Sequence, residues 1–329
     1  MGRIQLTVAL GDYDHTRDLA SGQVGAAGLE LTVVNLRLEE IVHRCLTYRE
    51  WDVCEMSLAS YVSLLATGED WLVAIPVFTS RMFRHSAFYV GAQSDVHALS
   101  DLRGRRVGVP VWAQTACVYA RALVAEDGGV PLSEIEWVQA GLDEAGRKEL
   151  THVALPPNVR LSRVDDESLT TLLDSRKIDA IISARPPASF LSGQRTMRRL
   201  FDSPEVVAAE YYARTQIYPI MHVVVMRRTI YERYPWIAGN LLAAFEEAKA
   251  RSMRRCLTGA IANFPIPLVY ELASKWADRL GGDLWPYGIE ENRPTLEAFL
   301  GYCVDQGIGL PRISPDDLFA AETRTRWRS

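Results

Sequence analysis

The chain has 329 residues, of which 48% are hydrophobic and 23% are charged, and its formal net charge at pH 7 is -5. This length exceeds what one ordinary hydrophobic core organises, and it predicts two lobes of roughly 150 residues each. The net negative charge excludes a protein that binds the nucleic-acid backbone without sequence preference, and the fraction of apolar residues excludes a largely disordered chain.

The amino-terminal segment lacks the pattern of a secretory signal, because Arg3 is followed by a short alternating apolar run that soon reaches Gly11. No window of about 18 uninterrupted apolar residues occurs, so the sequence predicts no membrane partner. The cysteines are odd in number and form no C-x-x-C pair, which favours reduced thiols over disulfides or a zinc site. They are Cys45, Cys54, Cys117, Cys256 and Cys303. We therefore expect a cytoplasmic protein.

Short apolar runs alternate with helical patterns over the first two thirds of the chain. We expect strands at residues 3–10, 29–34, 52–56, 72–78, 86–91, 105–109, 178–183 and 220–226. Between them, apolar residues at three- and four-residue spacing predict amphipathic helices at 38–48, 57–67, 114–126 and 166–176. This order is typical of an α/β fold with a largely parallel sheet flanked by helices.

The last third of the chain is helical in pattern. Pro235 suits the first turn of one long helix that continues to Leu257, and further helical patterns occur at 266–280 and 294–306. The order of elements predicts a discontinuous first lobe, residues 1–92 and 222–329, and a second lobe, residues 93–221. The two crossings would form a hinge near 90–93 and 219–222, where glycine, proline and polar residues interrupt the apolar runs.

Ligands of open α/β sheets bind beyond the carboxyl ends of the strands, so the residues after each expected strand are the candidates for a site. In this chain they are unusually polar, aromatic or sulfur-containing. The first-lobe candidates are Tyr13, Asp14, His15, Met56, Ser57, Ser80, Arg81, Arg84 and His85. The second-lobe and crossing candidates are Trp112, Gln114, Thr115, Arg185, Met221 and His222. We expect them to face one cleft between the lobes.

This set of side chains suits a small anionic ligand with an aromatic ring. An arginine fork binds a carboxylate through two hydrogen bonds, and aromatic or methionine side chains cover the face of a ring. A helix that begins near Gln114 would add free backbone N–H groups that point at the cleft. Structural roles are also open: Arg81 and Arg84 suit surface ion pairs, and Tyr13 and Asp14 suit a turn and a helix cap.

Several motifs of nucleotide and hydrolase chemistry are absent from the sequence. It contains no G-x-x-x-x-G-K-[ST], no G-x-G-x-x-G after a strand, no G-x-S-x-G and no H-E-x-x-H. We expect a site without a cofactor, although a divalent metal stays open as an alternative. Oxygen and nitrogen ligands for such a metal would come from Asp14, His15, Glu55, His85 and His222. No spacing motif supports it.

Longer segments of the sequence resemble a known family. DLRGRRVGVP at residues 101–110 resembles the opening of the second lobe in type II periplasmic-binding-protein folds. Further segments together resemble the 4,5-dihydroxyphthalate decarboxylase family: WDVCEMSLASYVSL (51–64), IPVFTSRMFRHSAFYV (75–90), IDAIISARPP (178–187), YPIMHVVVMRR (218–228) and WPYGIEENRPTLEAFLGY (285–302). The resemblance covers nearly the whole chain. It departs from the family at Val111 and Trp112, where an acidic residue and a tyrosine are usual.

The resemblance implies a cytosolic enzyme with a two-lobed, type II periplasmic-binding-protein-like fold that removes one carboxylate from a catecholic diacid. Without a cofactor, such a reaction protonates the ring carbon that carries the leaving carboxylate, and a phenolic hydroxyl supplies electrons. The expected roles are carboxylate clamping by Arg81, Arg84 and Arg185, proton delivery by His85 or His222, and binding of the phenolic hydroxyl by Asp14 or His15.

Two alternatives to a decarboxylase stay open. The same cleft would suit a non-catalytic protein that binds or senses a small anion, or another enzyme that acts on aromatic acids, such as a dehydratase. A homo-oligomer also stays open, because the carboxyl-terminal third contains aromatic residues suited to an interface, among them Trp276 and Tyr302.

Overall fold

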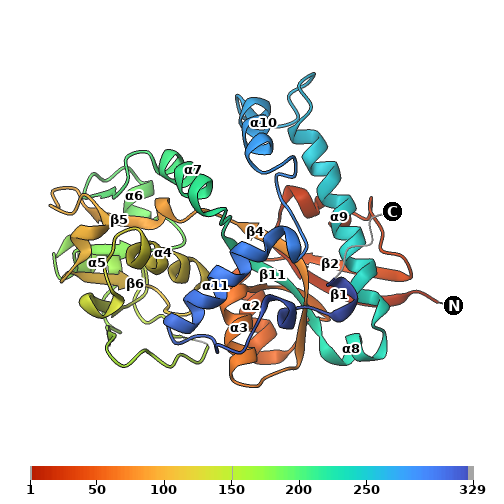
Figure 1. Ribbon diagram of the computed structural model, residues 1–329, viewed down its shortest axis with the longest axis horizontal. Coiled ribbons are helices and arrows are strands. Elements are labelled where there is room, and N and C mark those ends of the chain that lie inside the picture. Colours follow the sequence, from red (N-terminus) through yellow and green to blue (C-terminus); the bar gives the residue numbers. More distant parts are fainter. Residues whose placement is uncertain (1, 150, 325–329) are drawn as a thin grey trace.

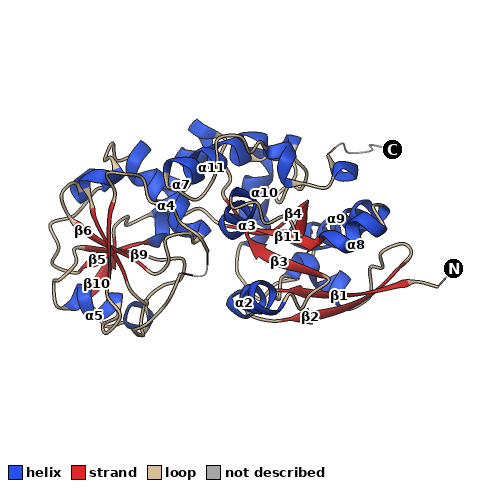
Figure 2. Cartoon of the chain, turned by 90° about the horizontal axis from the view of Figure 1, so that it is seen from below, coloured by secondary structure: helices blue, strands red, loops and turns tan. Residues whose placement is uncertain are grey.

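The computed structural model describes residues 2–149 and 151–324, and it has two lobes that lie side by side (Figure 1). Each lobe is built around one β-sheet. Figure 2 shows that the helices of each lobe pack around that lobe's own sheet. The expected two-lobed α/β fold is therefore confirmed, and so is the helical character of the last third.

The first lobe holds a five-stranded sheet with the order β2-β1-β3-β11-β4. Its strands are β1 (Ile4–Leu10), β2 (Leu29–Asn35), β3 (Val53–Ser57), β4 (Leu72–Arg81) and β11 (Ile220–Arg227). β1 runs parallel to β2 and β3, whereas β11 lies between β3 and β4 and runs antiparallel to both. The amino end of β11 therefore lies beside the carboxyl ends of β3 and β4.

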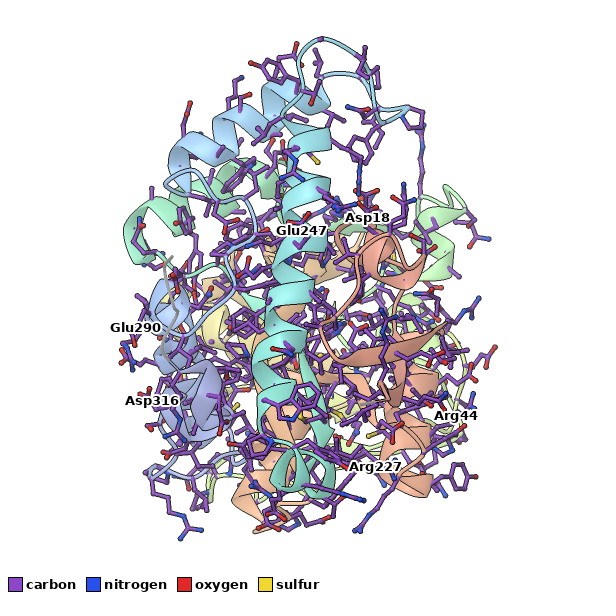
Figure 3. All side chains as sticks on the ribbon, turned by 90° about the vertical axis from the view of Figure 1, so that its right-hand side faces the viewer. Asp18, Arg44, Arg227, Glu247, Glu290 and Asp316 are labelled. Carbon is purple, nitrogen blue, oxygen red and sulfur yellow. The ribbon has the colours of Figure 1, made fainter. Side chains whose placement is uncertain are left out.

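The helices of the first lobe are α1 (Arg17–Ala20), α2 (Leu38–Tyr48), α3 (Leu58–Ala66), α8 (Arg228–Arg233), α9 (Trp236–Cys256), α10 (Val269–Arg279) and α11 (Arg293–Asp305). Most of them lie around the sheet, whereas α10 packs on α9 away from it (Figure 1). In α9, Ile237, Leu241 and Phe245 recur at four-residue spacing and are buried, as expected for an amphipathic helix. Figure 3 shows α9 along the side of the first lobe that faces away from the second, with the labelled Glu247 on this helix and Asp18 close to it.

The second lobe holds a six-stranded sheet with the order β10-β5-β9-β6-β7-β8. Its strands are β5 (Phe88–Gly91), β6 (Arg106–Val109), β7 (Glu136–Gln139), β8 (Arg160–Arg163), β9 (Ala180–Ile182) and β10 (Met197–Arg199). Its helices are α4 (Thr115–Glu126), α5 (Leu169–Asp174), α6 (Ala188–Leu191) and α7 (Pro204–Thr215). No helix in the described part of the chain is both long and apolar enough to cross a bilayer.

The crossing between the lobes differs from the sequence expectation at one end. Residues 88–91, expected in the first lobe, form β5, which pairs antiparallel with β9 and β10 in the second sheet. The chain therefore crosses before β5, through the 3-10 turn His85–Ala87. It returns just before β11, within the expected range 219–222. Residues 1 and 325–329 of the expected first lobe lie outside the described residues.

Candidate active site

A cavity of about 520 Å³ lies between the lobes, at the carboxyl ends of β3, β6 and β9 and the amino end of β11. We call it the cleft. Its walls on the side of the first lobe and the crossing segment include Glu39, Ser57, Met82, Arg84, Met221 and His222. On the side of the second lobe they include Val111, Gln114, Thr115, Arg147, Lys148, Glu149 and Ala184. The cleft thus brings together six of the residues expected from strand ends: Ser57, Arg84, Gln114, Thr115, Met221 and His222.

His222 lines the cleft at a bulge in β11, where the pairing with β4 is irregular on both sides of it. Its Nδ1 lies 2.5 Å from Oε1 of Glu55, a fully buried side chain. Glu55 also accepts hydrogen bonds from the Tyr13 hydroxyl at 2.6 Å and from the N–H of Gly11 at 2.8 Å. With Nδ1 held by Glu55, Nε2 is the ring nitrogen that can reach a ligand.

The electrostatics of this group keep Glu55 ionised. Burial would raise the pKa of Glu55, but the nearby His222 and the hydrogen bonds from His222, Tyr13 and Gly11 hold that pKa below its usual value. Burial and the negative charge of Glu55 raise the pKa of Tyr13 far above its usual value, so the hydroxyl stays protonated and donates. Glu55 is therefore a carboxylate that orients the His222 ring.

Gly11 permits this arrangement. A Cβ atom at Gly11 would lie 2.7 Å from the ring of Tyr13, closer than a real side chain tolerates. The absence of a side chain lets Tyr13 fold back over the end of β1, so that its hydroxyl reaches Glu55.

Arg84 is a buried cation in the wall of the cleft, with 6% of its surface exposed. Its Nε donates to the sulfur of Met221 at 3.0 Å, and its Nη1 donates to the carbonyl of Ala184 at 3.1 Å. Burial lowers the pKa of Arg84 to about 10, which leaves it charged at neutral pH. Within residues 2–149 and 151–324, no carboxylate forms an ion pair with it. A buried cation without a counter-ion is unfavourable, so this geometry favours an anionic ligand.

Two further cations line the cleft from the loop that follows β7. Arg147 is half-buried and Lys148 is exposed. Neither side chain makes a hydrogen bond or an ion pair with another residue that the structure describes. Both are therefore free to meet an anion in the cleft.

The two lobes touch at the floor of the cleft. The hydroxyl oxygens of Ser57 and Thr115 lie 2.9 Å apart, and Thr115 Oγ1 also accepts the N–H of Ala59 at 3.0 Å. Thr115 is the first residue of α4, so this contact ties the start of α4 to the end of β3.

Four of the expected site residues line a different cavity of about 720 Å³, which we call the second cavity: Asp14, His15, Arg81 and His85. Its other walls are largely apolar and aromatic and come from α7, α9, α10 and the segment after β4, including Phe83 and Trp276. Met82 lines both cavities.

Arg81 is committed to structural contacts, contrary to its expected role in clamping a carboxylate. Its guanidinium donates to the carbonyl of Tyr218 at 2.9 Å, to the carbonyl of Pro286 at 2.7 Å and to the side chain of Asn292. Burial lowers its pKa to about 10. Arg81 therefore joins the crossing segment to the carboxyl-terminal region.

Asp14 is also held within the protein. It accepts a hydrogen bond from Ser252 at 2.6 Å and pairs with Arg255 at 3.2 Å and Arg17 at 2.7 Å. Burial opposes ionisation, but these donors keep the pKa of Asp14 below its usual value. The residue ties the start of α1 to α9.

His15 and His85 are uncharged at neutral pH, because burial lowers the pKa of each to about 4. The ring of His15 lies between those of Tyr13 and Trp285, with centroids 5.3 and 5.1 Å away. The ring of His85 packs edge-on against Tyr211 at 5.3 Å. In the described part of the chain, Nε2 of His15 and both ring nitrogens of His85 lack a hydrogen-bond partner.

The remaining candidates lie outside the walls of the cleft. Met56 is buried in the core, and Ser80 is half-buried at the end of β4. Trp112 is buried with its ring 3.8 Å from the guanidinium of Arg121, so its side chain is part of the second lobe's core and not of the cleft. Arg185 is exposed and follows Ala184, which does line the cleft.

Four residues of this region were missed or underrated from the sequence. Glu55 was expected only as a metal ligand, although a glutamate inside the apolar run DVCEMS is a signal for a buried, paired carboxylate. Arg147, Lys148 and Glu149 follow β7, a four-residue strand that the apolar pattern did not predict. Without that strand, nothing in the pattern placed this loop at the cleft.

The five residues considered for a metal do not come together at one place. Glu55 and His222 contact each other, whereas Asp14, His15 and His85 line the second cavity. Among the described residues, no three side chains of His, Cys, Asp or Glu form a group that would hold a metal ion.

Comparisons with known proteins give two close relatives and a shared fold. The chain matches no family model. It is 35% identical over 320 residues to a 4,5-dihydroxyphthalate decarboxylase of Comamonas testosteroni, covering 97% of each chain. It is 34% identical over 213 residues to a 4,5-dihydroxyphthalate decarboxylase of Pseudomonas putida, covering 64% of this chain and 83% of that one. Among solved structures, the periplasmic aliphatic sulphonate binding protein SsuA from Escherichia coli shares the fold, with a TM-score of 0.55, 13% identity and coverage of 98% and 99%.

Proposed function

Because the chain belongs to the 4,5-dihydroxyphthalate decarboxylase family, we propose that it removes one carboxylate as CO2 from a hydroxylated aromatic dicarboxylate such as 4,5-dihydroxyphthalate. The substrate binds in the cleft between the lobes. Membership of this family makes the protein a carboxy-lyase, as the resemblance of its segments implied.

The choice of the cleft as the substrate site rests on one observation. Arg84 is buried and has no counter-ion among the described residues, and it lines the same cavity as His222, a histidine that a buried carboxylate orients. A carboxylate of the substrate supplies the missing counter-ion, and the histidine supplies a proton donor. In the second cavity, by contrast, Arg81 and Asp14 are already paired within the protein.

The remaining walls of the cleft suit the rest of such a substrate. A dicarboxylate carries two negative charges, and Arg147 and Lys148 add positive charge on the second-lobe side. The sulfurs and methylene groups of Met82 and Met221 offer an adaptable apolar surface for the ring. Closure of the lobes would remove water and strengthen the contacts of the anion with Arg84.

The proposed reaction is a proton transfer followed by loss of CO2. Nε2 of protonated His222 donates its proton to the ring carbon that bears the leaving carboxylate, while a phenolic hydroxyl para to that carbon supplies the electron pair. The carbon–carbon bond to the carboxylate then breaks, CO2 leaves, and its bonding electrons restore the aromatic ring. Water returns a proton to His222. Glu55 keeps the ring of His222 in place, and Arg84 holds the carboxylate that stays.

This assignment narrows the roles expected from the sequence. Proton delivery goes to His222 because His85 lines the second cavity. Carboxylate binding goes to Arg84 because Arg81 is committed to carbonyl groups. Arg185, exposed beside Ala184, is retained as a residue that could close over the substrate.

A reducing, cytoplasmic compartment is part of the proposal. The sulfurs of Cys45 and Cys54 lie 3.4 Å apart as thiols, and all five cysteines are free. Two buried thiols this close are compatible with a compartment that keeps cysteines reduced.

The experiment that tests the function is a substrate panel. The purified protein is incubated with 4,5-dihydroxyphthalate, phthalate and several hydroxybenzoates, and CO2 and the aromatic product are measured. We expect one CO2 and one 3,4-dihydroxybenzoate for each 4,5-dihydroxyphthalate consumed, and no reaction of phthalate, which lacks the electron-donating hydroxyl. Thermal stabilisation by these acids without any CO2 would instead identify a binding protein.

A further inference from the structure

The proposed reaction needs a group that holds the phenolic hydroxyl, and the residues expected for this role are not in the cleft. Asp14 and His15 line the second cavity. Among the residues described as lining the cleft, two are carboxylates, Glu39 and Glu149. A carboxylate is a suitable partner for a phenol, because it accepts hydrogen bonds and is stronger in this role than a neutral acceptor.

Glu149 is fixed in position by the protein. Its Oε2 accepts the backbone N–H of Trp112 at 2.7 Å and that of Ala113 at 3.3 Å. The side-chain amide of Gln139 lies 3.4 Å from the same oxygen, and Thr151 donates to Oε1 at 3.1 Å. Oε1 therefore has one donor and retains capacity for a second hydrogen bond. The other carboxylate, Glu39, is exposed on α2, and its side chain makes no hydrogen bond or ion pair with the described part of the chain.

The position of Glu149 also affects how a dicarboxylate can lie. The two backbone N–H groups that precede α4 would otherwise attract an anion, since they are free donors near a helix start. Glu149 occupies them with its own negative charge. A substrate carboxylate is therefore disfavoured at this end of the cleft and favoured at Arg84.

We propose that Glu149 is the hydroxyl-binding residue of the cleft: it accepts a hydrogen bond from a phenolic hydroxyl of the ligand and so directs the carboxylates toward Arg84. As the hydroxyl supplies electrons to the protonated ring, positive charge develops on the phenolic oxygen, and the carboxylate of Glu149 stabilises it. This inference rests on the proposed function, because it names the part of an aromatic hydroxy acid that the second lobe recognises.

The test compares two ligands that differ only in their hydroxyl groups, 3,4-dihydroxybenzoate and benzoate. Their dissociation constants are measured by calorimetry for the wild type, for Glu149→Gln and for the control Glu144→Gln, which changes an exposed glutamate of the same loop outside the walls of the cleft. Glutamine keeps the size of the side chain and an oxygen acceptor for the backbone N–H groups, but it removes the charge. We expect Glu149→Gln to weaken 3,4-dihydroxybenzoate about ten-fold or more, the usual effect of losing a hydrogen bond to a charged group, and to change benzoate by less than two-fold. Glu144→Gln should leave the affinity for both ligands unchanged.

Two results would overturn the inference. Equal weakening of both ligands would mean that Glu149 only shapes the cleft. Unchanged affinity of Glu149→Gln for 3,4-dihydroxybenzoate would mean that another group binds the phenolic hydroxyl. Both readouts are independent of turnover, so a protein that released no CO2 in the substrate panel would disprove the proposed function and still give a clear answer on Glu149.

Discussion

His222 reaches the cleft through a local irregularity of the backbone. The bulge in β11 places its side chain at the carboxyl ends of β3 and β4, and Glu55 from β3 holds one ring nitrogen. Bulges commonly re-aim a side chain at a functional site. A histidine oriented in this way by a carboxylate is a typical general acid or base.

Replacement of His222 tests this role directly. We expect His222→Asn to lower kcat by roughly 100- to 10,000-fold, the usual contribution of a general acid, and to leave the affinity for phthalate nearly unchanged. The matched control is His85→Gln, which alters a histidine in the second cavity and should keep most of the turnover. Steady-state kinetics and calorimetric titration with phthalate check both variants. Full turnover by His222→Asn would remove the assignment.

Arg84 and Arg81 form a second matched pair, because both are buried arginines and only Arg84 lines the cleft. We expect Arg84→Met to raise KM about ten-fold or more through the loss of a charge-assisted contact, with little change in the melting temperature. Arg81→Met should lower the melting temperature, because three acceptors at Tyr218, Pro286 and Asn292 lose their donor. A normal KM for Arg84→Met would place the carboxylate elsewhere.

At the scale of elements, the sequence predicted well those helices and strands that have a long, regular pattern of apolar residues. α2 was expected at 38–48 and is Leu38–Tyr48, and β1 and β11 agree within a residue. The elements that the pattern did not predict are short or polar: β8 reads RLSR, β10 has three residues, and α7 mixes charged with apolar residues. Such segments owe their conformation to neighbouring strands and to packing, which a local pattern does not contain.

The turn after β1 gives a prediction at this scale. A Cβ at Gly11 would meet the Tyr13 ring, so Gly11→Ala should push Tyr13 away from Glu55 and disturb the orientation of His222. We expect Gly11→Ala and Tyr13→Phe each to lower kcat, and the double variant to be no worse than the more impaired single variant, since both remove the same hydrogen bond. Steady-state kinetics of the three variants check this. Independent, additive losses would show that Gly11 does not act through Tyr13.

At the scale of the whole molecule, the sequence predicted that the site would lie at the ends of strands. It did not predict which of these residues would line the cleft and which would line the second cavity. Arg84 and His85 are neighbours in the chain, yet Arg84 lines the cleft and His85 lines the second cavity. The crossing segment between the lobes runs between the two cavities, with Met82 in the walls of both. Which cavity each of these side chains lines depends on how the two lobes are placed, and a local sequence pattern does not contain that information.

The two buried histidines of the second cavity give the molecule a pH-dependent stability. Burial lowers the pKa of both His15 and His85 from an ordinary value of 6.5 to about 4, so the unfolded chain binds more protons than the folded chain between these values. Their contribution to stability is therefore complete above about pH 6.5 and is lost as the pH falls toward 4. Between pH 7 and pH 4.5, this amounts to about 2 kcal/mol of unfolding free energy for each histidine.

We expect His85→Phe to lose part of this pH dependence, because phenylalanine fits the aromatic surroundings of His85 and does not bind a proton. Chemical denaturation at several pH values between 4.5 and 7 should give a shallower slope for His85→Phe than for the wild type. His43→Phe, a change at an exposed position on α2, is the control and should keep the wild-type slope. Equal slopes for all three proteins would mean that His85 takes up a proton as readily in the folded chain as in the unfolded one. The second cavity would then be open to water in solution, which its buried ring nitrogens argue against.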